Sequence, residues 1–472
     1  MPHLRERKWE RLKYILDLSN TGVYLDEETW NLEKVADTTH KFVKKYGLDW
    51  EPDRIIPDNP QLIKSIFQAG IELASQLGVY MRDTQRIIPY GAEEIHTGLY
   101  TVPKKVKMGH SKDARILFSR KVMDVRPPLV WGGSPGTALP EDLFLPIETS
   151  YAQESIIDML STGSLATVDG REVRTGTTLE VMATQKELKL LRRAIEKAGR
   201  SGMGLMGAES SVSAYGDLSV ANPGLLRPCD AHLIAMQNEL KVDYTGLTKA
   251  ANSIEYGMRN SSLPCVLVGG LGGDAPGSAV LTIASFALSN LAYLTDFHSL
   301  HPIHIRQVAT TTRSVLWVES VVCQAFAQHA PCIIFGDIYP KSGAMTRELL
   351  YEVAANAIVI TVSGGHLKGP ASADGLLPNC SGLEARWMGE VGHAVAHQQM
   401  SFQQANMLVK ELLNKYEHVF IQPNGNPGKA FDKVYDLESL RPIPEWTKMY
   451  EDVRKELREM GLDIPYKRSE EA

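Results

Sequence analysis

The sequence predicts an α/β protein whose main domain is a closed (β/α)₈ TIM barrel, and three observations support this fold. Seven short apolar runs, five of which end at Gly, Pro or Asp, alternate with helix-length segments, which is typical of a parallel sheet. Such regular spacing over about 220 residues suits a closed barrel better than an open sheet. The length of 472 residues also exceeds the roughly 250 of a bare barrel, which leaves room for attached segments. The seven runs are Gly202–Gly207, Ala231–Met236, Pro264–Gly270, Ile303–Ala309, Pro331–Asp337, Ala357–Gly364 and His418–Pro423.

Residues 1–126 are predicted to form a mixed, mainly helical extension packed on the barrel. Its amphipathic patterns predict helices over Lys8–Leu18, Glu27–Tyr46 and Pro60–Gly78. At Pro127–Thr137 an apolar run meets a Gly and Pro cluster, which indicates the entry to a barrel domain at 127–430. The tail at 431–472 is predicted to be a charged amphipathic helix that serves packing or oligomer contact.

The composition indicates an ordinary globular protein, with 43% hydrophobic and 22% charged residues. A net charge of -6 argues against binding nucleic acid, since such proteins usually carry a basic face. The basic start leads into an amphipathic pattern rather than an apolar run, and the apolar stretch Gly277–Leu294 is interrupted by polar residues, so neither export nor a membrane span is expected. Five scattered cysteines without a CxxC pair favour free thiols, and we expect a cytoplasmic protein.

Two glycine-rich stretches, Gly132–Gly136 and Gly269–Gly273, lack the signatures of nucleotide-binding loops. Neither has the Gly-Lys-Ser/Thr of a Walker loop or the GxGxxG of a Rossmann turn. Glycines also allow a large planar ligand or a partner protein to approach the backbone closely. Gly270, Gly272 and Gly273 are therefore candidate contacts for such a ligand.

Three histidines, His298, His301 and His304, suggest a metal cluster at first sight. Side chains three apart in a strand point to opposite faces, so at most two of them converge unless Pro302 marks a bend. Core or loop histidines and a zinc site both remain open, and no metal ligands are assigned. His301 is retained as a candidate substrate contact.

Polar residues gather near the predicted strand ends, where barrel enzymes place their catalytic groups. His232 follows Asp230 in one strand, Glu239 lies beyond its end, and Asp337 ends another strand. Carboxylate and imidazole groups can orient a substrate or donate a proton. A polar barrel layer without a catalytic role is the alternative. Thr310–Arg313 is most simply interpreted as a helix N-cap.

Several segments together resemble one family. They are Gly199–Ser219, Asp230–His232, Gln237–Lys241, His304–Arg306, Thr312–Arg313, Gly382–Val391 and, near the N-terminus, Asp83–Ile88. In these segments the chain is similar to the monomethylamine:corrinoid methyltransferases, barrel enzymes that carry genetically encoded pyrrolysine. The resemblance extends over nearly the whole chain. It implies a barrel, a corrinoid (cobalamin) carried by a cognate partner protein, and a homo-oligomer.

Three positions depart from the family pattern. Met206 stands where the family has pyrrolysine, and a thioether has no electrophilic carbon to engage an amine. Leu233 stands where the family has an acidic residue, and Tyr215 where it has Gln. Such a pocket should bind an ammonium poorly and suit a larger, less polar methyl donor.

Family members without pyrrolysine look like O-demethylase components, so we expect transfer of the O-methyl group of a methoxylated aromatic compound to Co(I) of the corrinoid protein. A phenolate leaving group with a conjugate-acid pKa near 10 would benefit from a donor, a cation or a metal such as zinc. The candidate catalytic residues are His232, Tyr215, Glu239 and Asp337. The residues expected to contact the substrate are Met206, Leu233, Tyr215 and His301.

Three alternatives stay open. One is a methylamine methyltransferase without pyrrolysine, and a second is a methyltransferase for a betaine or another quaternary amine, which an aromatic cage around the pocket would favour. The third is a non-catalytic scaffold that docks a corrinoid protein, which a barrel mouth filled with side chains would favour.

Overall fold

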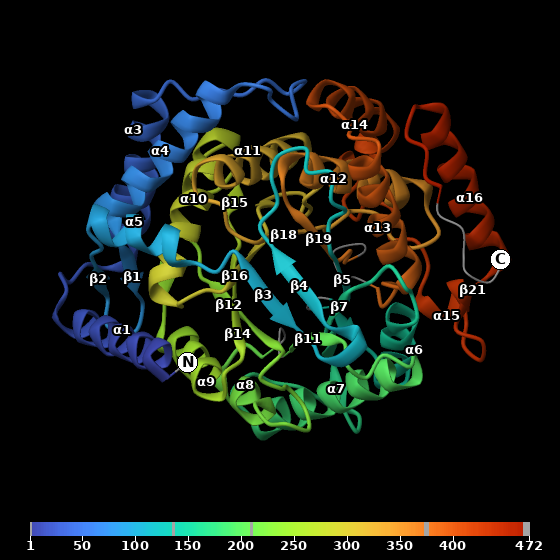
Figure 1. Cartoon of the computed structure of the whole chain (residues 1–472), viewed down its shortest axis with the longest axis horizontal. Helices are drawn as coiled ribbons and strands as arrows, with labels where there is room; N and C mark the ends of the chain where they lie inside the picture. The colour runs from blue at the N-terminus through green and yellow to red at the C-terminus, as the bar shows by residue number, and fades with distance from the viewer. Residues whose placement is uncertain (1, 135–136, 208–210, 372–376, 466–472) are drawn as a thin grey trace.

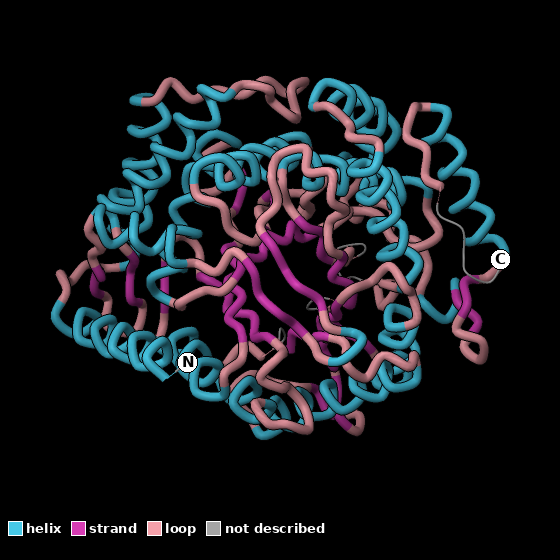
Figure 2. Tube along the Cα trace, viewed as in Figure 1, coloured by secondary structure: helices cyan, strands magenta, loops and turns pink. Residues whose placement is uncertain are grey.

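The computed structural model describes residues 2–134, 137–207, 211–371 and 377–465. In that part of the chain eight parallel strands close into a barrel in the order β11-β12-β14-β16-β18-β19-β5-β7, and helices form a ring around them (Figure 1). The tube in Figure 2 shows the strands at the centre of this ring. The barrel strands are β5 (Val130–Gly133), β7 (Met159–Ser161), β11 (Gly204–Gly207), β12 (Ala231–Met236), β14 (Arg259–Pro264), β16 (Phe297–Leu300), β18 (Ile334–Asp337) and β19 (His366–Lys368).

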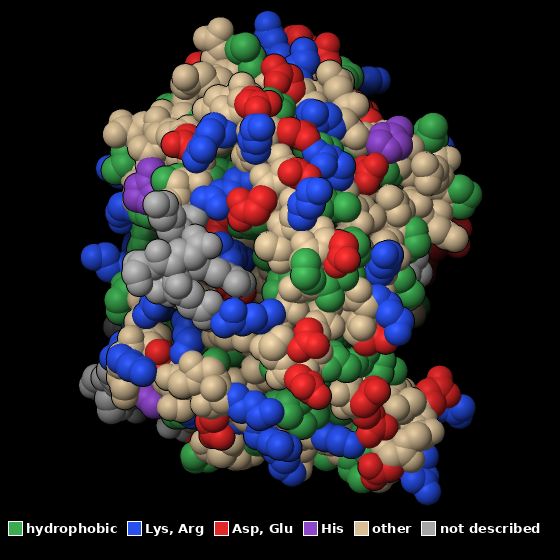
Figure 3. Space-filling model, turned by 90° about the vertical axis from the view of Figure 1, so that its right-hand side faces the viewer, with side chains coloured by type: hydrophobic (Ala, Val, Ile, Leu, Met, Phe, Trp, Pro, Cys, Tyr) green, Lys and Arg blue, Asp and Glu red, His purple; other side chains and the backbone are tan. Residues whose placement is uncertain are grey.

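Each of the surrounding helices follows one barrel strand along the chain, as expected for a parallel barrel. They are α6 (Glu141–Ala152), α7 (Thr178–Lys197), α8 (Ala214–Val220), α9 (Tyr244–Tyr256), α10 (Ala275–Ala292), α11 (Arg313–His329), α12 (Arg347–Ser363) and α13 (Gly382–His397). The chain then adds α14 (Phe402–Tyr416), α15 (Phe431–Val434) and α16 (Pro444–Glu459). Thr312 caps α11 by accepting a hydrogen bond from the Val315 N–H, which confirms the N-cap interpretation. On the side that carries α16, acidic and basic side chains are interspersed (Figure 3).

The N-terminal extension covers one side of the helical ring. Its helices are α1 (Pro2–Thr21), α2 (Glu27–Thr29), a π-helical segment (Trp30–Ala36), α3 (Asp37–Lys45), α4 (Pro60–Leu77) and α5 (Ala92–Thr101), with a small sheet of β1 (Val79–Met81), β2 (Arg86–Ile88) and β13 (Lys241–Val242). Every residue of α10 is buried beneath it. Among the described residues, α10 is the one helix long and apolar enough to span a membrane. It is buried in the way a core helix is, which agrees with the polar residues that interrupt its apolar sequence.

A β-hairpin from the extension closes the amino end of the barrel. Strands β3 (Lys105–Met108) and β4 (Arg115–Phe118) pair in antiparallel fashion and lie in front of the barrel in Figure 1. Their apolar side chains Val106, Met108 and Leu117 are buried in one cluster with barrel residues. The hairpin is bonded to residues just before β12 and β11, because Gly109 N–H donates to the Cys229 carbonyl (2.9 Å) and His110 N–H to the Gly202 carbonyl (2.8 Å).

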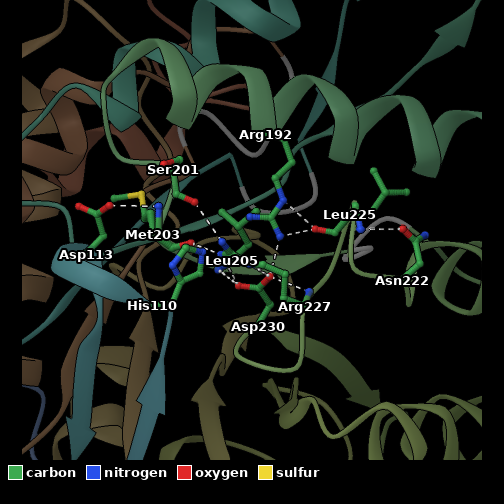
Figure 4. Close-up of polar contacts among 12 residues, drawn as sticks. His110, Asp113, Arg192, Ser201, Met203, Leu205, Asn222, Leu225, Arg227 and Asp230 are labelled. Atoms are coloured by element: carbon green, nitrogen blue, oxygen red, sulfur yellow. Dashed lines mark hydrogen bonds and ion pairs between the residues drawn. The ribbon is translucent and has the colours of Figure 1, made fainter.

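Asp230 fixes this closed end of the barrel (Figure 4). Its side chain is fully buried and accepts hydrogen bonds from Arg192 (2.7 Å), from Arg227 (3.0 Å) and from the Leu205 N–H (3.0 Å). Asp113 supports the neighbouring turn by accepting the Gly202 N–H at 3.0 Å. Asp230 thus joins the start of β11 to the segment before β12, far from the carboxyl ends of the strands.

The sequence located some strands and missed others. The runs at Gly202, Ala231 and Pro331 do contain β11, β12 and β18, and Pro127–Thr137 contains β5. Ala357–Gly364 was predicted as a strand but lies in α12, because a fully buried helix is as apolar as a buried strand. His418–Pro423 is instead largely a 3₁₀ helix, Glu417–Ile421.

Two further predicted runs begin at or just after the end of a barrel strand and do not contain it. The barrel uses Arg259–Pro264 and Phe297–Leu300, and the predicted runs instead contain the short outer pair β15 (Leu267–Val268) and β17 (Ile303–His304). The barrel strands contain Ser, Asn and His residues, with Ser261 and Ser299 facing inward, and so escaped a search for apolar runs. Other short pairs are β6 (Ala138–Leu139) with β8 (Ser164–Leu165), β9 (Thr167–Val168) with β10 (Arg171–Glu172), and β20 (Tyr435–Asp436) with β21 (Arg441–Pro442).

The strand registers arrange the inward-facing side chains in layers. If one moves around the barrel from each residue to the residue after its partner on the next strand, the path closes on itself. The inward-facing residues on this path, one from every second strand, are Trp131, Met206, Ser261 and Phe335. In such a barrel alternate strands contribute the four side chains of each layer. The layer above this one, toward the carboxyl ends, holds Ser161, Leu233, Ser299 and Lys368. The next holds Gly133, Leu263 and Asp337, and the rim above it Gly163, Ala235, His301 and Pro370.

We expect the Asp230→Ala variant to lose about 3–5 kcal/mol of stability, because two largely buried arginines would lose the carboxylate that balances their charge. Chemical denaturation of the variant and the unaltered chain measures the loss. The control is Glu172→Ala, which removes an exposed ion pair with Arg174 and should change stability by about 1 kcal/mol or less. Equal losses in both variants would contradict the anchoring role of Asp230.

Candidate functional site

Met206 faces the barrel interior in the layer that also holds Trp131, Ser261 and Phe335, which we call the floor. Its side chain is fully buried and belongs to an apolar cluster with Trp131, Leu233 and Phe335. The rings of Trp131 and Phe335 are 5.2 Å apart and meet edge to face. The position where the family resemblance places pyrrolysine thus packs among apolar and aromatic side chains.

Above this floor, the inward-facing side chains of β12 and β14 are more exposed to solvent than those of the other strands. Leu233 is 7% exposed, Leu263 one layer higher is half-buried, and Ala235 at the rim is exposed. Exposure therefore increases toward the carboxyl ends of β12 and β14. We refer to Ser161, Leu233, Ala235, Leu263, Ser299, His301, Asp337 and Lys368 as the barrel mouth.

Asp337 and Lys368 form a buried ion pair in the barrel mouth. They are register partners on β18 and β19, and the Lys368 ammonium lies 3.4 Å from each carboxylate oxygen. Burial raises the pKa of Asp337, while Lys368 opposes that shift. Oδ1 of Asp337 accepts no hydrogen bond, although the lysine charge is close. The pair thus offers one negative and one positive group at the same depth.

His301 completes this polar side of the mouth. Its Nδ1 lies 3.6 Å from Asp337 Oδ2, and its ring meets that of Tyr339 edge to face at 4.6 Å. Burial, together with the charge of Lys368, lowers the pKa of His301 to about 3. His301 is therefore a neutral imidazole at physiological pH.

Glu239 is a buried carboxyl group at the end of β12. Burial raises its pKa to about 7, against the opposing effects of the Leu267 N–H, which donates to Oε1 at 3.3 Å, and of Lys241. Oε2 has no hydrogen-bond partner. Burial, followed by the negative charges of Glu239 and Asp337, raises the pKa of Cys265 to about 12, which keeps this thiol protonated.

Two buried side chains of α12 hold the loops behind this site. Glu352 accepts hydrogen bonds from the Lys341 N–H (2.8 Å), the Ser342 N–H (2.9 Å) and the Thr311 hydroxyl. Asn356 accepts from the Thr310 hydroxyl at 2.6 Å, and that hydroxyl accepts from the Tyr339 N–H. These bonds fix the loops after β16 and β18, and with them the segment that carries Tyr339.

His232 and Tyr215, both expected in the site, lie outside the barrel. His232 alternates with the inward-facing Ala231 and Leu233, so its side chain points toward the helices, where Nδ1 lies 3.1 Å from Asp217. Asp217 also contacts the Lys249 ammonium at 2.8 Å. Tyr215 is 58% exposed on α8. Neither side chain lines the barrel interior, because the period of two along a strand directs residue 232 outward.

The histidines and glycines singled out in the sequence do not form one centre. His298 points outward, stacks on Phe286 at 4.2 Å and contacts Ser262 at 2.7 Å, while His304 lies on β17. Within the described ranges no group of three or more His, Cys, Asp or Glu could hold a metal ion. Gly270 and Gly273 form a tight turn after β15, and a Cβ at Gly272 would collide with α10. A corrinoid contact at this turn stays a prediction.

Comparison with known proteins identifies the family. The family model described as monomethylamine methyltransferase MtmB matches residues 13–462. MtmB1 of Methanosarcina barkeri is 31% identical over 450 residues, which is 94% of this chain and 97% of that protein. MtmB2 of Methanosarcina acetivorans is also 31% identical, over 454 residues, with the same coverage. The chain belongs to the monomethylamine methyltransferase family.

Solved structures of this family have the same fold. The crystal structure of the Methanosarcina barkeri monomethylamine methyltransferase superposes with a TM-score of 0.92 at 30% identity, covering 96% of this chain and 98% of that one. The crystal structure of its hydroxylamine complex gives the same values. The predicted barrel is thereby confirmed. These relatives are named for monomethylamine, so the comparisons favour the methylamine alternative over O-demethylation of methoxylated aromatics.

The sequence of the present chain allowed some of the inward-facing residues at and below the barrel mouth to be predicted. Met206, Leu233, His301 and Asp337 were predicted as site residues and do face the barrel interior. Lys368 and Ser161 were missed, because their strands are three residues long and carry no apolar run. Only the register relative to neighbouring strands reveals that both side chains face inward.

We expect the stability advantage of the Glu239→Gln variant over the unaltered chain to grow as pH rises from about 5 to about 8. The folded chain holds a proton on Glu239 up to about pH 7, whereas the unfolded chain releases it near pH 4.5, so its folding stability decreases with rising pH in that window. The expected change is about 2–3 kcal/mol at most. Denaturation midpoints at both pH values measure it.

The matched control is Glu438→Gln, at an exposed position, whose difference from the unaltered chain should not depend on pH. If the Glu239→Gln and Glu438→Gln variants responded alike, Glu239 would not be the buried acid described above.

Proposed function

We propose that this protein transfers a methyl group from a methylated amine to Co(I) of a partner corrinoid protein. One observation carries the proposal: a chain that matches monomethylamine methyltransferases over 94% of its length has Met206 in the barrel interior, below the barrel mouth. The corrinoid is a co-substrate brought by the partner. The relatives support the amine class, and the inward-facing residues support a substrate seated above Met206.

The hairpin β3–β4 supports one direction of approach. It fills the amino end of the barrel with Val106, Met108 and Leu117, so the cobalt and the methylated amine both enter from the carboxyl ends. Co(I) attacks the methyl carbon in line, the carbon–nitrogen bond breaks, and its electron pair remains on nitrogen. The transferable methyl group must therefore point out of the barrel, with nitrogen below it.

The floor favours a quaternary ammonium as the methyl donor. A quaternary ammonium leaves as a neutral amine without a proton, whereas a neutral primary amine must first be protonated or bound to an electrophile. Met206 supplies no electrophilic carbon. The aromatic rings of Trp131 and Phe335 beside it attract cationic methylammonium groups, with an energy of about 0.5–2 kcal/mol for each ring. Two neighbouring rings are fewer than the aromatic cage that the quaternary-amine alternative names, but they support a cationic substrate in the same way.

A substrate panel tests the proposal. Purified protein and its corrinoid partner, or free cob(I)alamin as acceptor, are mixed with monomethylamine, tetramethylammonium, N,N,N-trimethylglycine or 3-methoxybenzoate, and loss of the Co(I) absorption is followed. We expect conversion with at least one methylated amine, a quaternary one before monomethylamine, and none with the methoxyarene. Conversion with the methoxyarene alone would establish O-demethylation instead, and no conversion with any donor would favour a docking scaffold.

A second experiment tests where the reaction takes place. We expect Ala235→Trp to lower the rate of methyl transfer at least tenfold, because an indole at this exposed rim position would obstruct the barrel mouth while leaving the core intact. The control is Met407→Trp, at an exposed position on the outer helix α14, which should retain the full rate. Thermal unfolding of both variants monitors folding. Full activity in Ala235→Trp would place the reaction elsewhere.

A further inference from the structure

The barrel mouth has an apolar half and a polar half. Strands β12 and β14 contribute Leu233, Ala235 and Leu263, next to Met206 of β11. The opposite arc consists of β18, β19, β5 and β7, four consecutive neighbours in the barrel. This arc contributes the polar side chains Asp337, Lys368, Trp131 and Ser161. A substrate bound here would therefore meet polar groups from this arc and apolar side chains from β12 and β14.

Three hydrogen-bond donors lie together on that polar arc. Lys368 and Trp131 are register partners on β19 and β5, and Ser161 lies on the next strand, β7, opposite Gly133. The indole Nε1 of Trp131 and the hydroxyl of Ser161 are fully buried and have no hydrogen-bond partner. A buried polar group without a partner costs about 1–3 kcal/mol. An indole N–H can only donate, so the group that would satisfy it is an acceptor.

Asp337 and Lys368 bring groups of opposite charge together among the described residues of the barrel mouth. They lie 3.4 Å apart, and His301 beside them is neutral. A ligand with a single positive charge would gain from Asp337 but be repelled by Lys368. A ligand that carries both charges would complement both groups, since electrostatic complementarity selects the partner that meets each charge with its opposite.

We propose that the substrate is a compact zwitterion, a methylated ammonium that carries a carboxylate. The carboxylate is bound by Lys368, Trp131 and Ser161 on the polar arc. The methylated ammonium lies between Asp337 and the apolar half, above Met206. This inference rests on the proposed methyl transfer for the identity of the ammonium, and on the orphaned donors for the carboxylate.

The zwitterion leaves the methyl-transfer chemistry unchanged and balanced. The methyl carbon loses its bond to nitrogen and gains one to cobalt, the electron pair stays on nitrogen, and the carboxylate takes no part. The product is an amine with one methyl group fewer and an unchanged carboxylate. Because the ammonium charge disappears, the product no longer complements Asp337, which favours its release.

A matched ligand pair tests the carboxylate. N,N,N-trimethylglycine and its methyl ester have the same ammonium, but the ester lacks the negative charge. Isothermal titration calorimetry with the whole protein, without corrinoid, measures both affinities. We expect the zwitterion to bind at least tenfold more tightly than the ester. Equal or tighter binding of the ester, or of tetramethylammonium, would overturn the proposal.

Two variants assign the preference to Lys368. Lys368→Met should abolish the tenfold preference for the zwitterion, so that it and the ester bind about equally. Lys415→Met on the outer helix α14 should leave the preference unchanged. If Lys368→Met does not fold because Asp337 loses its partner, the double variant Asp337→Asn with Lys368→Met removes both charges and keeps the mouth neutral. A preference that persists in the folded variant would contradict binding of the carboxylate by Lys368.

Methyl transfer to cob(I)alamin, measured on the same preparations, separates this inference from the proposed function. Transfer from tetramethylammonium without preferential binding of the zwitterion would reject the inference and leave the methyltransferase assignment standing. Tight, Lys368-dependent binding of the zwitterion without transfer from any methylated amine would reject the proposed function and leave the carboxylate site standing.

Discussion

The strand register of the barrel is the constraint on which the rest of the structure depends. One residue of stagger at each strand closes the circuit on itself, and it decides for every strand residue whether the side chain faces the interior or the helices. Met206, Leu233, Asp337 and Lys368 face the interior for this reason, and His232 does not. A shift of one residue in β12 alone would turn Leu233 outward and His232 inward.

The fold was predictable from the sequence to a large extent, while the site was predictable only in part. The alternation of apolar runs with helix-length segments identified the parallel barrel, and the amphipathic patterns identified the helices of the extension. Buried α12 was predicted to contain a strand, because helices enclosed on all sides lose their polar stripe. The three-residue strands β7 and β19 are too short to show any period.

The same limits apply to the site residues. Asp337 was recognisable because it follows a strongly apolar strand. Lys368 was not, since a lysine directly after His366 and Leu367 has no local pattern that indicates burial. His232 was predicted to be catalytic, but its side chain points away from the barrel interior. That direction depends on the strand register, which a single sequence does not reveal. Charge pairing across β18 and β19 is likewise visible only once the strands are placed side by side.

The plug formed by β3 and β4 has a kinetic consequence for any bimolecular reaction in this barrel. Since the hairpin closes the amino end of the barrel, the small methyl donor and the large corrinoid-bearing partner must both use the entrance at the carboxyl ends of the strands. A donor that arrives after the partner has docked would find its path obstructed, and a spent donor could depart only once the partner withdraws. Turnover would thus follow a compulsory order, with the small molecule first in and last out.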